Sequence, residues 1–161
     1  MMLGYWQDPE RTEQSFVQGP EGRWYISGDR ARRDADGYLW YAGRSDDVIN
    51  SAGYRIGPLE VESVLLEHPA VQECAVVASP DVERGEVVKA FIVLRSGFDG
   101  SPSLIADLQA HAKAMTAPYK YPRRIEFLAE LPKTITGKIR RRALRDLELE
   151  RAGSTGRASG G

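Results

Sequence analysis

The sequence lacks the features that mark membrane, secreted and metal-binding proteins. No apolar run among its 161 residues approaches the roughly 20 residues that a bilayer-spanning helix needs. The single cysteine, Cys74, cannot form an internal disulfide, and one cysteine with two histidines makes a poor set of zinc ligands. The first residues (MMLGYW) show neither the basic segment nor the apolar core of a signal peptide. We therefore expect a soluble protein of a reducing compartment.

An excess of charge of either sign is also missing. Lys and Arg number 22 and Asp and Glu number 23, which gives a net charge of −1. A dedicated nucleic-acid-binding protein normally carries a basic excess, so we expect no nucleic-acid partner. Apolar residues make up 42% of the chain and charged residues 28%, a balance that can bury a core and argues against wholesale disorder. The length suits one domain, or one domain with a piece of another attached.

The aromatic residues are concentrated near the beginning of the sequence. Eight of the 14 Phe, Trp and Tyr residues, including all three tryptophans, lie in the first 41 residues among turn signals such as GPEG and DADG. Short aromatic runs between such turns are typical of strands joined by hairpins. Isolated hairpins cannot bury this much aromatic surface by themselves. We therefore interpret residues 1–43 as a β-rich part of a larger domain.

Hydrophobic periodicity from residue 44 onward predicts a compact α+β domain. The predicted elements are helices at 58–68 and 102–116, strands at 71–78, 87–94 and 124–127, a polar turn at 80–86, and a last helix with Ile139, Ala143, Leu144 and Leu147 on one stripe. Proline at the start of both early helices supports their placement. We place this domain at residues 44–150 and expect a disordered Gly- and Ser-rich tail at 151–161.

Two segments have the composition of a nucleotide site. In residues 25–29 (YISGD), Asp29 follows a glycine at a strand end, where its carboxylate can accept two hydroxyl hydrogen bonds, as from a ribose. The same pattern also occurs in ordinary turns. Residues 43–62 (GRSDDVINSAGYRIGPLEVE) place two arginines, which suit phosphates, around Gly53, which allows a ligand close to the backbone. The alternative for this second segment is a hairpin and a capped helix with solvated charges.

A third segment, residues 131–142 (LPKTITGKIRRR), carries a mobile cation. Lys138 follows a Thr-x-Thr-Gly loop at the start of the last predicted helix, where it can meet a phosphate or a carboxylate. The alternative is a basic helix face that contacts only water. The Gly-Lys pair is not a P-loop, because the upstream glycine is absent and no strand leads directly into it.

In this order and spacing, the three segments resemble the AMP-forming acyl-CoA synthetases of the adenylate-forming superfamily. The resemblance extends from about Gly4 to Leu149 and is closest to the medium-chain branch, through residues 51–58 (SAGYRIGP), 84–91 (RGEVVKAF) and 117–123 (APYKYPR). Such enzymes join a carboxylic acid to ATP, release pyrophosphate, and pass the acyl group from the acyl-adenylate to the thiol of CoA, releasing AMP. The resemblance implies ATP with Mg²⁺, CoA and a fatty or aromatic carboxylic acid as ligands.

The resemblance also implies a fold and a role for individual residues. The fold would be the small C-terminal lid domain, a mixed sheet with flanking helices, with residues 1–43 as the last strands of the large N-terminal domain. Lys138 would be the catalytic lysine of adenylation, and its acetylation by a lysine acetyltransferase would switch adenylation off. The other implied roles are ATP or AMP binding by Asp29 and Arg44, a hinge at Asp46, CoA binding by Ala52, Gly53, Tyr54, Arg84, Lys113 and Tyr121, and contact with the acyl-adenylate by Arg55. No metal site is implied in this sequence.

The sequence departs from complete family members in its length. A complete synthetase is several times longer and has a Ser/Thr/Gly-rich phosphate loop and an acyl pocket that this sequence lacks. We therefore expect the chain to act as the lid of a synthetase, with an N-terminal domain as its partner, and to be inactive alone. The alternatives are a stand-alone module that binds CoA or an acyl-adenylate, and a partner that completes a truncated synthetase in trans. We expect a cytoplasmic location in bacteria, or the mitochondrial matrix in an animal.

Overall fold

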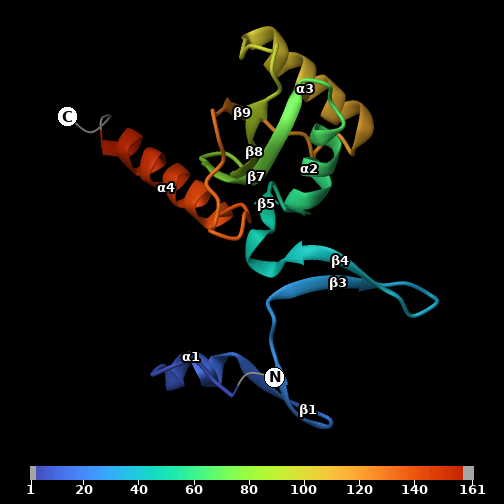
Figure 1. Ribbon diagram of the computed structural model, residues 1–161, viewed down its shortest axis with the longest axis vertical. Helices are drawn as coiled ribbons and strands as arrows, with labels where there is room; N and C mark the ends of the chain where they lie inside the picture. Colours follow the sequence, from blue (N-terminus) through green and yellow to red (C-terminus); the bar gives the residue numbers. More distant parts are fainter. Residues whose placement is uncertain (1–2, 158–161) are drawn as a thin grey trace. The chain divides into compact units, whose positions relative to one another are not determined.

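A computed structural model describes residues 3–157 and divides the chain into two compact units. Unit 1 is Met1–Asp46 and unit 2 is Asp47–Gly161. The elements of unit 1 are α1 (Pro9–Gln14), β1 (Phe16–Gly19), β2 (Gly22–Tyr25), β3 (Asp29–Arg33) and β4 (Leu39–Arg44) (Figure 1). A short 3₁₀ turn, η1 (Ser45–Asp47), covers the boundary between the units.

Unit 1 consists of two separate antiparallel hairpins and one short helix. β1 pairs with β2, and β3 pairs with β4, as the turn signals in the sequence predicted. The helix α1 was not predicted, although Asp8 accepts a hydrogen bond from the Arg11 N–H and Pro9 occupies the first helical position, two ordinary signals of a helix start.

Unit 1 does not build a core from its own residues. Among the described residues 3–46, no large apolar side chain is buried, and Trp6, Trp24 and Trp40 are exposed by 89, 52 and 59%. The β3–β4 hairpin is instead closed by polar contacts, because Asp34 accepts hydrogen bonds from the indole of Trp40 (2.6 Å) and from the Tyr38 N–H (2.9 Å). The hydrogen bond from Trp40 holds the pKa of Asp34 below its usual value.

Unit 2 is a five-stranded mixed sheet with helices on both faces. Its elements are β5 (Ile49–Ser51), β6 (Tyr54–Ile56), α2 (Pro58–Leu66), β7 (Val71–Asp81), β8 (Gly85–Leu94), α3 (Pro102–Met115), β9 (Arg124–Phe127) and α4 (Arg141–Arg157). The order β6-β5-β8-β7 is antiparallel throughout, and β9 joins β8 in parallel. This is the mixed α+β fold that the sequence predicted.

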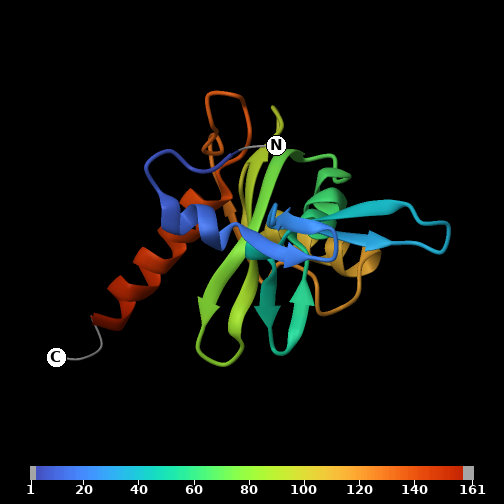
Figure 2. The ribbon, with the colours of Figure 1, turned by 90° about the horizontal axis from the view of Figure 1, so that it is seen from below.

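The two faces of the sheet carry separate hydrophobic clusters. On one face, Val76 and Val88 pack with Leu65 of α2 and Leu108 of α3. On the other face, Ala75, Val77, Phe91 and Val93 pack with Leu131 and with Leu144 of α4. Neighbouring residues of β7 point to opposite faces, as strand geometry requires. Figure 2 accordingly shows α4 on one side of the sheet, with α2 and α3 on the other.

Several element boundaries differ from those predicted. Strand β8 begins at Gly85 rather than at residue 87, so the predicted polar turn at 80–86 is shorter. Strand β7 continues to Asp81, because β7 is an edge strand that pairs only with β8 and therefore tolerates Pro80. Helix α4 begins at Arg141, so Lys138 and Ile139 lie in the preceding loop rather than on the helix. In that loop, the Arg140 N–H donates to the Pro132 carbonyl and the Thr134 N–H donates to the Lys138 carbonyl, where the sequence predicted the first turn of the helix.

At its far end, α4 continues to Arg157, past the start of the tail predicted at residue 151. Residues 158–161 of that tail lie outside the described residues. In the described part of the chain, no helix combines the length and apolarity required to cross a bilayer.

Buried charges fasten α4 to the sheet. The ammonium of Lys89 on β8 contacts Glu148 of α4 at 2.6 Å and Glu126 of β9 at 2.7 Å. Burial alone would raise the pKa of Glu148, but the hydrogen bonds from Lys89 and Ser79 and the nearby positive charges outweigh it and hold the pKa below its usual value. The start of α4 is held separately, by the Arg141 guanidinium on both oxygens of Glu62 at 2.6 and 3.0 Å.

Candidate functional site

The β3–β4 hairpin brings Asp29 and Arg44, the two residues predicted to bind nucleotide, to opposite positions on paired strands. Their side chains lie 3.6 Å apart. Arg44 also contacts the carboxylate of Asp46, the predicted hinge residue, at 2.9 Å and donates a hydrogen bond to the Ser27 carbonyl at 3.3 Å. The arginine therefore connects the two sequence segments that carried the nucleotide prediction.

The backbone at Gly28 makes this arrangement possible. Its φ is +77°, in the left-handed region that favours glycine, and a Cβ at this position would lie 2.8 Å from a guanidinium nitrogen of Arg44. The Gly28 carbonyl accepts hydrogen bonds from both the backbone N–H and the hydroxyl of Ser45, at 2.8 and 2.9 Å. Asp29, at the end of this locked turn, keeps a half-exposed carboxylate that can accept hydrogen bonds from a pair of ligand hydroxyls.

In unit 2, Ala52 and Gly53 form the two-residue turn between β5 and β6. Their φ values are +48° and +84°, which is typical of the tight turn that joins twisted antiparallel strands. The Ala52 N–H donates to the Arg84 carbonyl at 3.2 Å, so the turn between β7 and β8 lies directly beside it. No heavy atom lies within 4 Å of a Cβ placed on Gly53, which leaves its backbone open to a ligand.

Tyr54 and Arg55 follow this turn on β6, and both are exposed. The Tyr54 ring stacks on that of Tyr119 in the loop between α3 and β9, with centroids 4.2 Å apart and an interplanar angle of 15°. The neighbouring Lys120 forms an ion pair with Glu60 of α2. The stack therefore joins the β5–β6 turn to the segment that carries Tyr121.

Lys113 and Tyr121 are also in contact. Lys113 lies in the last turn of α3, and its ammonium stands 4.2 Å from the centroid of the Tyr121 ring. The predicted CoA-binding residues thus form two groups, one around Ala52 and Arg84 and one around Lys113 and Tyr121. No hydrogen bond or ion pair among the described residues of unit 2 links Lys138 to either group.

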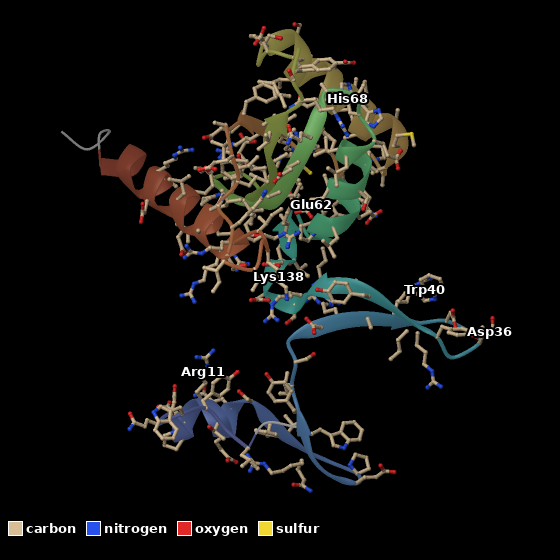
Figure 3. All side chains as sticks on the ribbon, in the orientation of Figure 1. Arg11, Asp36, Trp40, Glu62, His68 and Lys138 are labelled. Atoms are coloured by element: carbon tan, nitrogen blue, oxygen red, sulfur yellow. The ribbon has the colours of Figure 1, made fainter. Side chains whose placement is uncertain are left out.

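Lys138 lies in an exposed loop whose backbone is fixed (Figure 3). The Thr134 N–H donates to the Lys138 carbonyl at 2.8 Å, and the Lys138 N–H donates to the Thr134 hydroxyl at 3.1 Å. Gly137, with φ of +82°, makes the turn between them. At the loop's base, the Lys133 ammonium contacts Glu73 of β7 at 2.8 Å. The loop presents the ammonium of Lys138 to solvent from a preformed backbone.

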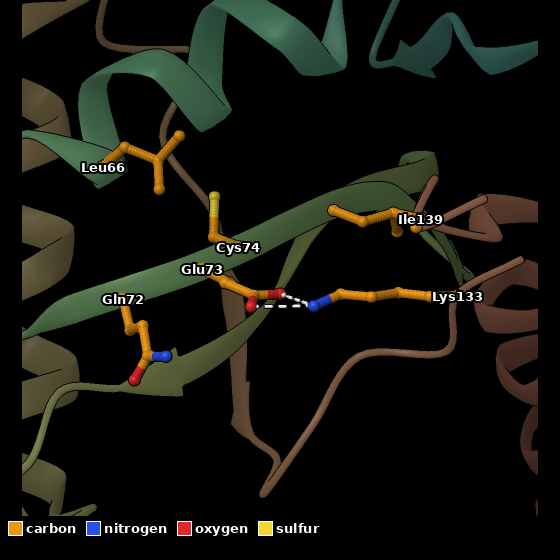
Figure 4. Close-up of a pocket in the computed structure, with 7 residues that line it drawn as sticks. Leu66, Gln72, Glu73, Cys74, Lys133 and Ile139 are labelled. Atoms are coloured by element: carbon orange, nitrogen blue, oxygen red, sulfur yellow. Dashed lines mark hydrogen bonds and ion pairs between the residues drawn. The ribbon is translucent and has the colours of Figure 1, made fainter. Parts of the chain in front are cut away.

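A cavity of about 300 Å³ is lined on one side by this loop (Figure 4). Its lining is formed by Leu66, Gln72, Glu73, Cys74, Lys133, Gly137 and Ile139. Cys74 is buried there, and burial raises the pKa of its thiol, so it is not a reactive thiolate. In the described residues, no cluster of three or more His, Cys, Asp or Glu is positioned to hold a metal ion.

Comparison with known proteins gives this arrangement a family. The model of the AMP-binding enzyme C-terminal domain matches residues 60–138, which include most of α2, the sheet strands β7–β9, α3 and the loop up to Lys138. The part of the chain that is similar to this domain family is therefore residues 60–138. The region ends at Lys138, and the nucleotide-site residues of unit 1 lie before it.

Curated relatives extend this domain's similarity over most of the chain. The mitochondrial acyl-coenzyme A synthetase ACSM4 of Rattus norvegicus is 61% identical over 92% of this chain and 25% of its own length. The mitochondrial acyl-coenzyme A synthetase ACSM5 of Homo sapiens is 58% identical over 89% of this chain and 24% of its own length. The chain therefore spans about a quarter of the length of these relatives and corresponds to the C-terminal part of acyl-CoA synthetases.

Solved structures of adenylate-forming enzymes share the fold. The anthranilate CoA ligase AuaEII, in complex with anthranoyl-AMP, matches with a TM-score of 0.81 and 47% identity, covering 93% of this chain and 28% of that one. The o-succinylbenzoate CoA synthetase of Bacillus subtilis, in complex with its acyl-adenylate intermediate, matches with a TM-score of 0.78 and 34% identity over 90% and 28%. The structural similarity therefore includes enzymes that are named for two different carboxylic acids, anthranilate and o-succinylbenzoate.

Three residues with structural links to the predicted site were not singled out in the sequence. Thr134 fixes the backbone of Lys138, Tyr119 stacks on Tyr54, and Arg123 contacts Tyr121. The alternation of aromatic and basic residues in segment 119–123 was a signal that could have found the last two.

Proposed function

We propose that this chain supplies the lid of an AMP-forming acid–thiol ligase. The reaction joins ATP and a carboxylic acid to an acyl-adenylate with release of pyrophosphate, and then transfers the acyl group to CoA with release of AMP. The observation that carries this proposal is the similarity to acyl-coenzyme A synthetases over nine-tenths of the chain, with the three site segments all within it. We propose medium-chain fatty acids as the substrate class, within fatty-acid metabolism. The similarity to these acyl-coenzyme A synthetases supports this choice.

The first half-reaction is assigned to Lys138 and the unit 1 hairpin. The ammonium of Lys138 bridges the α-phosphate of ATP and the oxygen of the attacking carboxylate, where it stabilises the negative charge of the transition state. Asp29 binds the ribose hydroxyls, and Arg44 contacts the nucleotide. The fixed backbone of the Lys138 loop supports this role, because a preformed loop costs less ordering when the substrate binds.

The second half-reaction, acyl transfer to CoA, is assigned to a different set of residues in unit 2. Ala52, Gly53 and Tyr54 line the path of the CoA thiol, and the open backbone at Gly53 leaves room for it. Arg84, Lys113 and Tyr121 bind the nucleotide part of CoA, and Arg55 contacts the acyl-adenylate. Asp46 is the hinge about which the lid turns between the two half-reactions, since a few backbone positions are enough to absorb such a rotation.

Activity measurements test the proposal. Pyrophosphate release from ATP and octanoate in the presence of CoA is measured with the chain alone and with the chain mixed with the N-terminal domain of an acyl-coenzyme A synthetase. We expect no release from the chain alone and release from the mixture, reduced about 10²–10³-fold by Lys138→Ala, the usual cost of losing such a stabilising group. Arg142→Ala, which removes an exposed cation of α4, is the matched control.

The same assay separates the alternatives. Activity from the chain alone would contradict the lid function. Binding of CoA by the chain without activity in any mixture would favour a stand-alone binding module, and restoration of a truncated synthetase only would favour a partner in trans. Acetylation of Lys138 is a further part of the proposal, because its side chain is exposed on the loop. Intact mass after treatment with a lysine acetyltransferase would show no added acetyl group if this part is wrong.

The cellular compartment that we propose depends on the organism from which the protein comes. The relatives named as mitochondrial support the mitochondrial matrix for an animal protein, and a bacterial protein of this class would act in the cytoplasm.

A further inference from the structure

The loop that carries Lys138 is closed at its base by backbone contacts. The Arg140 N–H donates to the Pro132 carbonyl at 2.8 Å, and Lys133 and Ile139 form an antiparallel bridge next to this hydrogen bond. A cavity of about 300 Å³ borders the loop on one side, so side-chain packing is incomplete there. An ion pair at each end of the loop adds to these contacts and ties the loop to the rest of unit 2.

The C-terminal end of the loop is fixed by a buried glutamate of α2. The carboxylate of Glu62, whose side chain is exposed by only 8%, accepts hydrogen bonds from the Arg141 guanidinium on both oxygens, at 2.6 and 3.0 Å. It also accepts one from the Val76 N–H of β7 at 2.8 Å. Because β7 is an edge strand, N–H groups on its open side need such an acceptor. Glu62 therefore places Arg141, three residues after Lys138, against both α2 and β7.

The N-terminal end of the loop is fixed by a second glutamate, on β7. The Lys133 ammonium contacts both carboxylate oxygens of Glu73 at 2.8 Å (Figure 4). The two side chains are exposed by 40 and 32%, so this pair contributes little to the stability of the fold. Its effect is local, because it restricts where the first residues of the loop lie on β7. Two glutamates thus hold the two ends of one loop.

We infer that Glu62 and Glu73 are positioning residues for Lys138 in adenylation, acting through Arg141 and Lys133. The inference rests on the proposed function and names the residues that hold its catalytic lysine in place. A misplacement of about 1 Å can cost about 10²-fold in rate, so a cation on a loosened loop is a poorer catalyst. Acyl transfer to CoA is assigned to other residues, so loosening this loop should leave that step unchanged.

Amide hydrogen exchange, measured by NMR on the chain alone, tests whether the glutamates hold the loop. Glu62→Gln keeps an acceptor for the Val76 N–H but removes the negative charge of its ion pair. We expect the Lys138 and Arg140 N–H groups to exchange about tenfold faster in this variant, since a charge-assisted contact is weakened. Glu73→Gln, at the more exposed pair, should accelerate the same two amides about threefold. Amides in the middle of β8 should be unchanged in both variants.

The two half-reactions, measured with the chain combined with a synthetase N-terminal domain, test whether this hold serves adenylation. Pyrophosphate exchange into ATP should fall about tenfold in Glu62→Gln and about threefold in Glu73→Gln, through kcat and with the KM for ATP within about twofold. Thioester formation from preformed octanoyl-adenylate and CoA should stay within about twofold of the parent. The charge-swapped variant Glu73→Lys/Lys133→Glu should restore exchange, because it rebuilds the ion pair.

A second variant and a matched control accompany these measurements. Arg141→Lys keeps both charges of the buried pair but loses the two-donor contact, so it should show the same selective loss even if Glu62→Gln fails to fold. Arg151→Gln removes a contact with Glu126 near the far end of α4 and should change neither the loop amides nor either half-reaction. Thermal melting verifies that each variant is folded.

Three results would overturn the inference. Faster amide exchange throughout unit 2, or equal slowing of both half-reactions, would assign the two glutamates to stability alone. Faster exchange of the loop amides with adenylation unchanged would mean that the position of the loop does not limit the reaction. A parent mixture without pyrophosphate exchange would overturn the proposed function and with it the role in adenylation, whereas amide exchange on the chain alone would still report whether the glutamates hold the loop.

Discussion

Lys138 combines a fixed backbone with a side chain that extends into solvent. Two hydrogen bonds with Thr134 hold its peptide group, at 2.8 and 3.1 Å, while the ammonium has no protein partner among the described residues. A cation that must reach a reacting phosphate benefits from this combination, because small errors of placement lower a reaction rate steeply. Thr134 is therefore a positioning residue in the proposed adenylation step.

Removing the hydroxyl of Thr134 tests this positioning role. We expect Thr134→Ala to slow acyl-adenylate formation about threefold to tenfold through kcat, with acyl transfer to CoA unchanged, because only the loop of Lys138 is loosened. Thr134→Ser should restore the rate, since serine keeps the hydroxyl. Ile135→Ala, in the same loop with a fully exposed side chain, is the matched control. Equal slowing of both half-reactions would instead assign Thr134 to stability.

At the scale of elements, α4 depends on charges that it buries against the sheet. Lys89, Glu126 and Glu148 form the centre of this contact, and the side chains of Lys89 and Glu148 are exposed by only 10 and 6%. The Ser79 hydroxyl donates to Glu148 at 2.6 Å, and Arg151 contacts Glu126 at 2.7 Å. Every carboxylate in this cluster has more than one partner, which offsets the cost of its burial.

Lys89→Met should therefore destabilise unit 2 by about 3 kcal/mol, because it leaves buried carboxylates without their central cation. The double variant Lys89→Met/Glu148→Met should recover a large part of this loss, since it removes the charge left behind. Urea denaturation measures both, with Arg142→Ala as an exposed control that should stay within about 0.5 kcal/mol of the parent. A single variant as stable as the parent would mean that the cluster does not fasten α4.

The sequence predicted elements better than it predicted their ends. Hydrophobic periodicity and the prolines placed α2, β8, α3 and β9 correctly, because each depends on local pattern. The start of α4 was wrong, since the loop before it is held by contacts between distant positions, such as Arg140 N–H to Pro132 carbonyl and Lys133 to Glu73. Helix α1 was missed, although its capping residues were visible.

Pairings in the candidate site were the least predictable feature. The motifs named Asp29, Arg44 and Lys113 through their resemblance to a family, but nothing in their spacing gives the 3.6 Å approach of Asp29 to Arg44 or the position of Lys113 over Tyr121. Both depend on strand register or on how a helix end meets a loop.

At the scale of the whole molecule, stability should depend on pH through the same buried cluster. Burial would raise the pKa of Glu126, but hydrogen bonds and charges from Arg151 and Lys89 hold it below its ordinary value of 4.5, as they do for Glu148. A carboxyl whose pKa is lower in the folded state stabilises the fold above the unfolded pKa and loses that contribution as pH falls through the folded one.

Urea denaturation at a series of pH values checks this expectation. The free energy of unfolding of unit 2 should be level near neutral pH and should fall below about pH 4.5, the ordinary glutamate value. Glu148→Gln should flatten this fall, because one of the two responsible carboxyls is gone. An unchanged acid limb in Glu148→Gln would place the responsible groups elsewhere in the molecule.

Each of the two units carries some of the residues with a proposed role. Unit 1 carries Asp29 and Arg44 on a hairpin without a core, and unit 2 carries Lys138 and the predicted CoA-binding residues on a well-packed sheet. The exposed aromatic side chains on unit 1 are typical of a surface that contacts further protein. In the proposed function, one lid serves two half-reactions through different residues.

The two half-reactions, measured separately, test this claim most directly. With the chain combined with a synthetase N-terminal domain, adenylation is followed as pyrophosphate exchange into ATP, and thioester formation is started from preformed octanoyl-adenylate and CoA. We predict that Lys138→Ala removes exchange and leaves thioester formation. Gly53→Asn, which fills the open turn with a residue that tolerates the left-handed backbone, should remove thioester formation and leave exchange. Loss of both half-reactions in either variant, with the variant still folded, would contradict the account.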